Sequence, residues 1–166
     1  MFDASLESAA QIIARHAPHH GVFPTLVPGL TLYRIESNAF IERTAGEIMT
    51  TFIVHGRKTT AIGGKMLEYG AGESLVCGIA SPSEFHTLDA SRDNPFLALS
   101  VSLDASILME YADALYDRHQ SAQLSEMPGG VFVICPDEDL RDVFLRLLKI
   151  LDRPKLIAVR APLKLR

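Results

Sequence analysis

A series of short β-rich segments between Val22 and Leu103 constrains the fold of this sequence most strongly. Runs of β-branched and aromatic residues recur there at intervals of about ten residues, separated by Gly, Pro and Asn. This spacing is typical of an antiparallel sandwich or barrel, because strands so close together are joined by tight turns. The expected strands are Leu30–Ile35, Ile48–His55, Lys58–Ile62, Met66–Tyr69, Glu73–Ala80, Glu84–Leu88 and Phe96–Ser102.

Paired glycines mark the clearest turn in this region. Gly63-Gly64 links two candidate strands, and two glycines tolerate the positive φ angles of a type I′ hairpin. A second glycine turn, Gly70-Ala71-Gly72-Glu73, leads into the next strand. We therefore predict a hairpin at Gly63-Gly64 and a meander of three consecutive strands around the two turns.

Helical periodicity brackets the β region on both sides. Residues Ser5–His16 have apolar side chains at helical spacing, which predicts a short amphipathic N-terminal helix. After Leu103, Asp104 is a suitable N-cap for a helix that extends to about residue 118. Val131–Cys135 is an apolar run short enough for one more strand.

The strongest helix signal follows Asp137, which we expect to be its N-cap. Its apolar residues recur at the i, i+3, i+4, i+7 spacing of an amphipathic helix: Leu140, Val143, Phe144, Leu147, Leu148 and Leu151. The stretch from Pro154 begins like a further helix. We predict one domain, in which residues 1–103 form a helix and a β-barrel and residues 104–166 form a helical part.

Composition and charge exclude several classes of protein. A chain of 166 residues has room for one domain, and its 48% hydrophobic content supplies a core. The net charge of −4 lacks the basic excess that nucleic acid requires. No apolar run is long enough for a membrane span, and Cys77 and Cys135 show no metal or redox spacing, so we expect a cytoplasmic protein without membrane contact.

Sequence motifs for catalysis are missing. No His-x-His pair occurs, there is no Gly-x-Ser-x-Gly elbow, and no glycine loop is followed by Gly-Lys-Ser/Thr. His55 and His86 lie in different predicted strands, where two imidazoles could meet inside a barrel and hold a metal. We favour a packing role for both histidines, and predict no catalytic residue, no metal and no cofactor.

The β region can nevertheless enclose a ligand. Strand alternation puts Met49, Thr51 and His55 on one face of their strand, and it puts Ser100 on a face of small and hydroxyl residues. Together with residues from two further strands, the candidates for lining a binding pocket are Met49, Thr51, His55, Cys77, His86 and Ser100.

Five sequence blocks, taken in order, resemble the N-terminal domain of AraC-type transcription regulators. The combination of Gly-Arg-Lys before a glycine hairpin and Tyr-x-x-Gly after it is the most specific part. The blocks are Thr25–Arg34, Phe52–Lys58, Gly63–Val76, Ile79–Pro82 and Asn94–Leu99. The resemblance implies a mainly β fold with α: a cupin-like double-stranded β-helix, or jelly-roll barrel, followed by helices used in dimerisation.

This resemblance implies sensing of an unknown small-molecule effector by a homodimer. The paired helix-turn-helix motifs that bind DNA in the family are missing after Arg166, so we expect DNA contact only through a part that this sequence lacks. Candidate dimer contacts lie on the apolar stripe of the last helix, at Leu140, Phe144, Leu147 and Leu151, although an intramolecular role is an equal alternative. Two other hypotheses remain. One is a stand-alone cupin-type metal enzyme that uses His55 and His86, and the other is a ligand-free dimerisation module.

Overall fold

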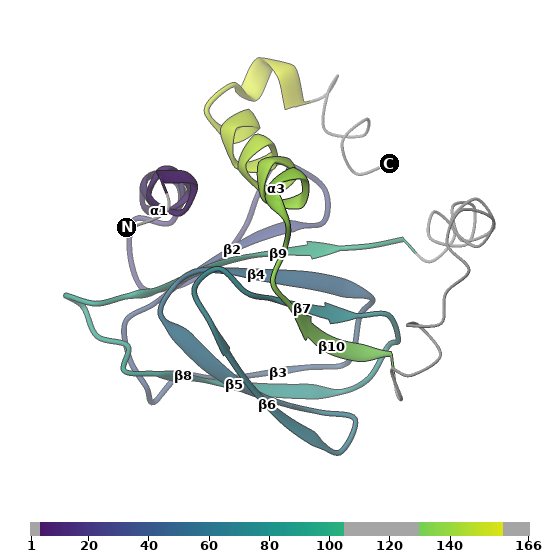
Figure 1. The fold of residues 1–166 in the computed structure, drawn as a ribbon. Coiled ribbons are helices and arrows are strands. Elements are labelled where there is room, and N and C mark those ends of the chain that lie inside the picture. Colours follow the sequence, from purple (N-terminus) through teal and green to yellow (C-terminus); the bar gives the residue numbers. More distant parts are fainter. Residues whose placement is uncertain (1–3, 105–129, 158–166) are drawn as a thin grey trace, which may run out of the picture.

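The fold has three layers, in which two helices cover one face of a large antiparallel sheet and a smaller sheet covers the other face (Figure 1). This computed structural model describes residues 4–104 and 130–157. The two facing antiparallel sheets confirm the expected class, a mainly β barrel of the cupin kind with a short N-terminal helix. The helix predicted to start after Asp104 and the chain after Ile157 lie outside the described residues.

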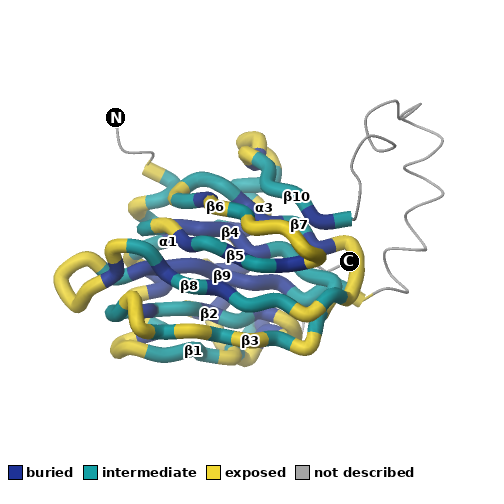
Figure 2. The backbone as a smooth tube through the Cα atoms, turned by 90° about the horizontal axis from the view of Figure 1, so that it is seen from below, coloured by how far each residue is buried: buried dark blue, intermediate teal, exposed yellow. Residues whose placement is uncertain are grey.

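The larger sheet has six strands in the order β1-β2-β9-β4-β7-β10. Its central strands are the most buried part of the chain, as the dark tube along β4 and β9 shows (Figure 2). The bounds are β1 (Gly21–Pro24), β2 (Leu30–Ile35), β4 (Met49–His55), β7 (Ser74–Cys77), β9 (Phe96–Ser102) and β10 (Val131–Ile134).

The smaller sheet has four strands in the order β3-β8-β5-β6. Every strand pair in both sheets is antiparallel, and the pairing of β4 with β9 shifts register between Ile53 and His55. The bounds are β3 (Ile41–Thr44), β5 (Arg57–Ile62), β6 (Lys65–Gly70) and β8 (Ser83–Leu88). The sequence prediction missed β1 and β3, which are short edge strands.

The Gly63-Gly64 hairpin is confirmed. Both glycines have positive φ, 56° and 75°, and Ile62 pairs with Lys65 across the turn. The predicted three-stranded meander is wrong, because β6 pairs with β5 whereas β7 belongs to the larger sheet. The turn between β6 and β7 instead crosses from one sheet to the other, and the Gly72 amide donates a 2.9 Å hydrogen bond to the Ile53 carbonyl of the larger sheet.

Two helices, α1 (Ala4–His16) and α3 (Glu138–Leu151), pack on each other and on the outer face of the larger sheet. Asp137 is the N-cap of α3, as predicted, and its carboxylate accepts a 2.9 Å hydrogen bond from the Leu140 amide. A short 3-10 turn, η2 (Pro154–Leu156), follows α3. Among described residues, no helix is long and apolar enough to cross a membrane.

The apolar stripe of α3 is used inside the chain. Phe144, Leu147 and Leu151 are buried in the core shared with α1 and the larger sheet, and Leu140 packs against that core. These four candidate dimer contacts therefore pack within their own chain, as the intramolecular alternative expects. Val143, which the periodicity included in the stripe, is instead 41% exposed.

An ion-pair cluster joins the ends of the two helices. Asp152, the C-cap of α3, accepts a hydrogen bond from Arg15 at 2.6 Å and lies 2.9 Å from the His16 ring. These contacts hold the pKa of the Asp152 carboxyl below its ordinary value. The C-terminal ends of α1 and α3 therefore lie side by side.

Candidate ligand pocket

A cavity of about 220 Å³ lies between the two sheets, where strands of the larger sheet face the edge strand β3. Its walls come from strands β1, β2, β3, β4 and β9 and from the loop before β4. The lining residues are Val22, Pro24, Thr31, Tyr33, Glu42, Thr44, Glu47, Met49, Ser100 and Ser102. The cavity has both apolar and polar walls, which is the usual character of a small-molecule site.

Strand alternation explains why these side chains face inward. Leu30 and Leu32 of β2 point to the helices and belong to the core beneath them, so Thr31 and Tyr33 point to the other face. Thr31 pairs with Ser100 of β9 in the register of the two strands. On the opposite sheet, Glu42 of β3 pairs with the buried Phe85, so its carboxylate also faces the interior.

The pKa values of two ionisable groups in the cavity are raised. Burial raises the pKa of the Tyr33 phenol, and the negative charges of Glu42 and Glu47 add to the rise. Burial also raises the pKa of the Glu42 carboxyl, which the positive charge of Lys58 offsets in part. Such perturbed groups around a cavity are typical of functional sites.

The remaining polar groups of the cavity are hydroxyls. Ser100 is 4% exposed, and its Oγ donates to the Met49 thioether sulfur at 3.5 Å, which is a weak acceptor. At the rim, the Ser102 hydroxyl donates a 2.7 Å hydrogen bond to Glu47. Ser100 also shares a hydrogen bond with the Tyr33 phenol, so the two hydroxyls form a polar pair in the cavity wall.

A buried lysine lies deeper between the sheets. Lys58 of β5 is 5% exposed, and its Nζ lies 4.0 Å from the centroid of the Phe85 ring, 5.5 Å from that of Tyr69 and 5.9 Å from that of Phe96. Aromatic faces stabilise an ammonium group in this arrangement. Burial nevertheless lowers the pKa of Lys58 to about 8, against the opposing influence of Glu42 and Cys77.

Four of the six residues predicted to line a pocket lie on the inner face of the larger sheet. Met49 and Ser100 line the cavity itself. Thr51 is buried and pairs with Ser100 in the register of β4 and β9, and Cys77 belongs to the core between the sheets. Burial raises the pKa of the Cys77 thiol, with Lys58 opposing. A binding role for these four residues stays a prediction.

The two histidines do not line the cavity. The register shift in β4 displaces His55 from the alternation assumed for it, and its Nδ1 lies 2.6 Å from the Pro95 carbonyl oxygen. His86 lies between the inward-facing Phe85 and Thr87, so its ring points outward, where Nε2 lies 2.9 Å from Glu84. The expectation that His86 lines the barrel is therefore wrong. His55 contacts the carbonyl of a loop residue and does not line the cavity.

The two histidines also lie apart from any group of metal ligands in the described residues. His55 and His86 have separate partners in the structure, and within residues 4–104 and 130–157 no three His, Cys, Asp or Glu side chains gather where they could hold a metal ion. The geometry of these two residues therefore does not support the alternative of a metal bound to them.

Sequence reasoning missed the most polar part of the cavity. Tyr33 was placed in a strand, and the same alternation that selected Ser100 could have selected it. Glu42 gave no such signal, because β3 is short and has the exposed Ile41 and Arg43 beside it. Its inward position follows from pairing with β8, which lies far along the chain.

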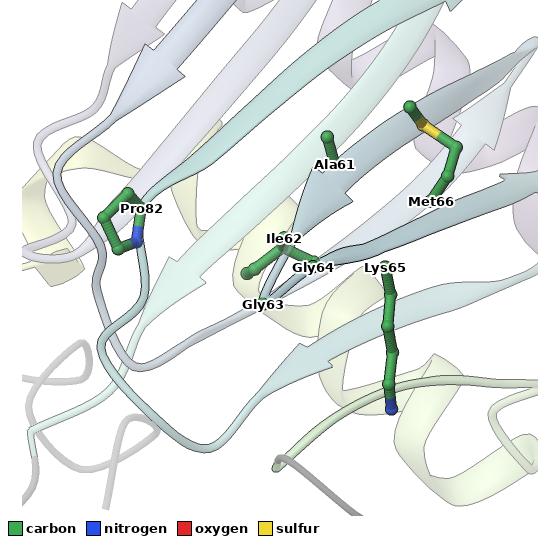
Figure 3. Close-up of a pocket in the computed structure, with 7 residues that line it drawn as sticks. All are labelled: Ala61, Ile62, Gly63, Gly64, Lys65, Met66 and Pro82. Carbon is green, nitrogen blue, oxygen red and sulfur yellow. The ribbon is translucent and has the colours of Figure 1, made fainter.

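A second hollow, of about 420 Å³, lies beside the β5–β6 hairpin. Figure 3 shows Lys65 extending away from Ala61 and Met66, so its charge does not converge with the other lining residues. Met66 is 68% exposed, and the paired turn glycines supply no side chain. This hollow lacks the convergent polar groups of the cavity between the sheets, which we take as the candidate site.

Comparison with solved structures gives similarities at low sequence identity. Apo ToxT K231A from Vibrio cholerae strain SCE256 is similar with a TM-score of 0.48 and 8% identity, over 81% of this chain and 53% of that one. This chain thus spans about half the length of that protein. A cupin 2 conserved barrel domain protein from Salinispora arenicola CNS-205 is similar with a TM-score of 0.37 and 16% identity, over 58% of this chain and 78% of that one.

An enzyme is also among the similar structures. Hydroxypropylphosphonic acid epoxidase from S. wedmorenis has a TM-score of 0.35 and 15% identity, over 46% of this chain and 44% of that one. No curated protein sequence matches this chain.

The family comparison covers most of the sequence. The description "AraC-type transcriptional regulator N-terminus" matches residues 26–166, which include all the strands except β1 and also include α3. The cavity, the helices on the opposite face of its sheet and the five sequence blocks all lie within or beside this range. The chain therefore belongs to the family of AraC-type transcriptional regulator N-termini.

Proposed function

We propose that this domain senses a small molecule in the cavity between its sheets and reports the occupancy to the rest of a cytoplasmic transcription regulator. One observation carries the proposal: in a member of this family, a cavity of about 220 Å³ is lined by convergent polar groups, among them Tyr33, Glu42 and Ser100. The domain acts by binding and not by catalysis, and DNA contact belongs to another part of the regulator.

The arrangement of layers supplies a route for the signal. Strand β4 has Met49 in the cavity wall, and three residues later it has Phe52 on the opposite face. The Phe52 ring stacks on Phe144 of α3, with centroids 4.9 Å apart and planes 14° apart. Because close-packed interiors transmit displacement, a ligand that shifts β4 will also shift α3.

Homodimer formation is part of the proposal. The apolar stripe of α3 fills the core of its own chain, so the dimer contact uses other residues. Sedimentation of the purified protein at several concentrations measures the oligomeric state, and a monomer at every concentration contradicts this part.

The sensing role is tested with a library of cellular metabolites at 1 mM, by thermal unfolding and then by calorimetry. A compound with Kd of about 10 μM is present at about 100 times its Kd and stabilises the protein by about 2.7 kcal/mol. For a domain of this size, each kcal/mol raises Tm by about 2–4 °C, so we expect a rise of about 5–10 °C.

A pair of variants locates the binding. Thr44 lines the cavity from β3, and we expect Thr44→Trp to block it. The neighbouring Arg43 is on the outer side of the same strand, where it pairs with Glu84, so Arg43→Trp is the matched control. Binding that is lost in Thr44→Trp and kept in Arg43→Trp supports the proposal. A library without any stabilising compound contradicts it and favours a ligand-free dimerisation module.

A further inference from the structure

The charged groups of the cavity all have the same sign. Glu42 and Glu47 contribute carboxylates, and the residues that line the cavity include no Lys, Arg or His. A carboxylate in a protein interior ordinarily has a basic partner. Glu47 lies at the exposed rim, so Glu42 is the group that needs a partner.

Within the described chain, one oxygen of the Glu42 carboxylate, Oε2, is buried and has no hydrogen-bond partner. Lys58 influences this carboxyl through its charge, but the two groups form no hydrogen bond or ion pair in the described structure. The Lys58 ammonium is instead held over the ring of Phe85. Glu42 thus has a carboxylate oxygen that does not accept a hydrogen bond from the Lys58 ammonium.

Other cavity groups favour the same kind of ligand. Ser100 and Tyr33 add a hydrogen-bonded pair of hydroxyl groups to the cavity wall, and their oxygens have further lone pairs that can accept from a ligand. Ser100 is 4% exposed, so this acceptor is part of the interior and not of the open surface. Val22 and Pro24 add apolar contact on the β1 side, which suits a short hydrocarbon group.

We propose that the effector bound in this cavity is a small organic cation, an amine or amidine with a short hydrocarbon part, whose charged N–H groups donate to Glu42. This inference rests on the proposed sensing function and specifies its ligand class. A volume of about 220 Å³ equals about seven water molecules at about 30 Å³ each, so the ligand is the size of a small metabolite.

Anionic ligands fit the site poorly. An anion in the cavity would lie beside Glu42 and Glu47, where like charges repel. A neutral alcohol can donate to Glu42, but a charge-assisted hydrogen bond from an ammonium is roughly twice as strong. We therefore expect selection by charge as well as by shape.

The test uses matched probes that differ in one functional group. The aromatic set is 2-phenylethylamine, 2-phenylethanol and 3-phenylpropanoate, and the aliphatic set is butylamine, butanol and pentanoate. Calorimetry at pH 7 measures their affinity for the full chain. We expect at least one amine to bind at least tenfold more tightly than its alcohol, and the carboxylates to bind more weakly still.

Two variants assign the preference to Glu42. Glu42→Gln keeps the shape of the side chain and removes its charge, and we expect it to lose the tenfold preference for the amine. Glu68→Gln is the control, because Glu68 is exposed on β6, where it pairs with Arg57 outside the cavity. Circular dichroism and Tm confirm that both variants fold, and chemical-shift changes at Tyr33 and Ser100 locate the bound amine.

Each other outcome has a definite meaning. Alcohols or carboxylates that bind as tightly as the amines overturn the inference and leave the sensing function intact. A preference that survives in Glu42→Gln, or shift changes confined to the outer surface, also overturn it. If no probe in either set binds, the inference is wrong, and the metabolite library then decides separately whether the cavity senses anything.

Discussion

Replacing Lys58 with Met should change how the stability of the domain depends on pH. Lys58 is buried among aromatic rings, and its pKa of about 8 lies below the ordinary value of 10.5. Between these two values the unfolded chain binds more protons than the folded one, so the free energy of unfolding rises with pH. Below pH 8 both states are protonated, and the full cost of the buried charge is present.

The magnitude follows from the difference between the two pKa values. At 1.36 kcal/mol per pKa unit, the change from 10.5 to about 8 corresponds to about 3 kcal/mol. About 2 kcal/mol of this appears between pH 7 and pH 9.5, because the unfolded chain is still largely protonated at pH 9.5. Methionine has a similar length and no charge, so Lys58→Met should lack this component.

Urea unfolding at half-unit steps from pH 7 to pH 9.5 measures the effect. We expect the free energy of unfolding of the original protein to rise by about 2 kcal/mol relative to that of Lys58→Met. The exposed Lys149 on α3 gives the control, and Lys149→Met should keep the original pH dependence. Lys58 also lowers the pKa of the Cys77 thiol, so its removal lets that pKa rise further and adds to the difference between the two curves in the same direction. Parallel curves for the original protein and Lys58→Met would refute the reasoning.

Three further predictions concern the folded framework, each measured by urea unfolding. Gly46 has φ of +103°, and a Cβ added there would lie 2.6 Å from the backbone nitrogen of Ser81. Gly64 has φ of +75° and no described atom within 4 Å of an added Cβ, so Gly64→Ala should cost only the backbone strain of about 1–2 kcal/mol. Gly46→Ala should therefore destabilise the protein more than Gly64→Ala, and equal losses would contradict this. Leu148→Ala, at a fully buried position, should cost about 2–5 kcal/mol, whereas Val143→Ala should cost clearly less, and the reverse order would show that α3 is rotated. Asp137→Ala should cost about 1 kcal/mol and Asp137→Asn much less, because Asn can still accept at the N-cap; a similar loss in both would assign the effect to charge.

Local signals in the sequence predicted much of the framework. The Gly63-Gly64 turn and the Asp137 N-cap depend on neighbouring residues alone, and both are confirmed. The meander was wrong because a glycine turn specifies a change of direction and not the sheet that the next strand joins. For β7, pairing with β4 and β10 decided the sheet, and those partners lie far away in the sequence.

The polar interior was harder to predict than the strands. Lysine and glutamate on a strand normally indicate a solvated face, so Lys58 and Glu42 gave no sign of burial. Only the register between β3, β8 and β5 brings these two side chains inside. The prediction for His86 was wrong for a related reason, because strand alternation separates two faces without indicating which face is the inner one.

The pairing of helix ends at Asp152 has an electrostatic consequence. Arg15 and His16 meet Asp152 at one end of the helix pair, and Ser5 and Glu138 line a common hollow at the other, so α1 and α3 run parallel. In parallel neighbours the helix dipoles add instead of cancelling, which gives partial charges of about one elementary charge at each end of the pair. Arg15 and His16 lie at the negative end, and the acidic side chains of Glu7 and Glu138 lie in the first turns at the positive end. These side-chain charges offset the dipoles at both ends of the pair, so added salt should weaken the charge contacts at the helix ends while the apolar core between the helices and the sheet is left intact.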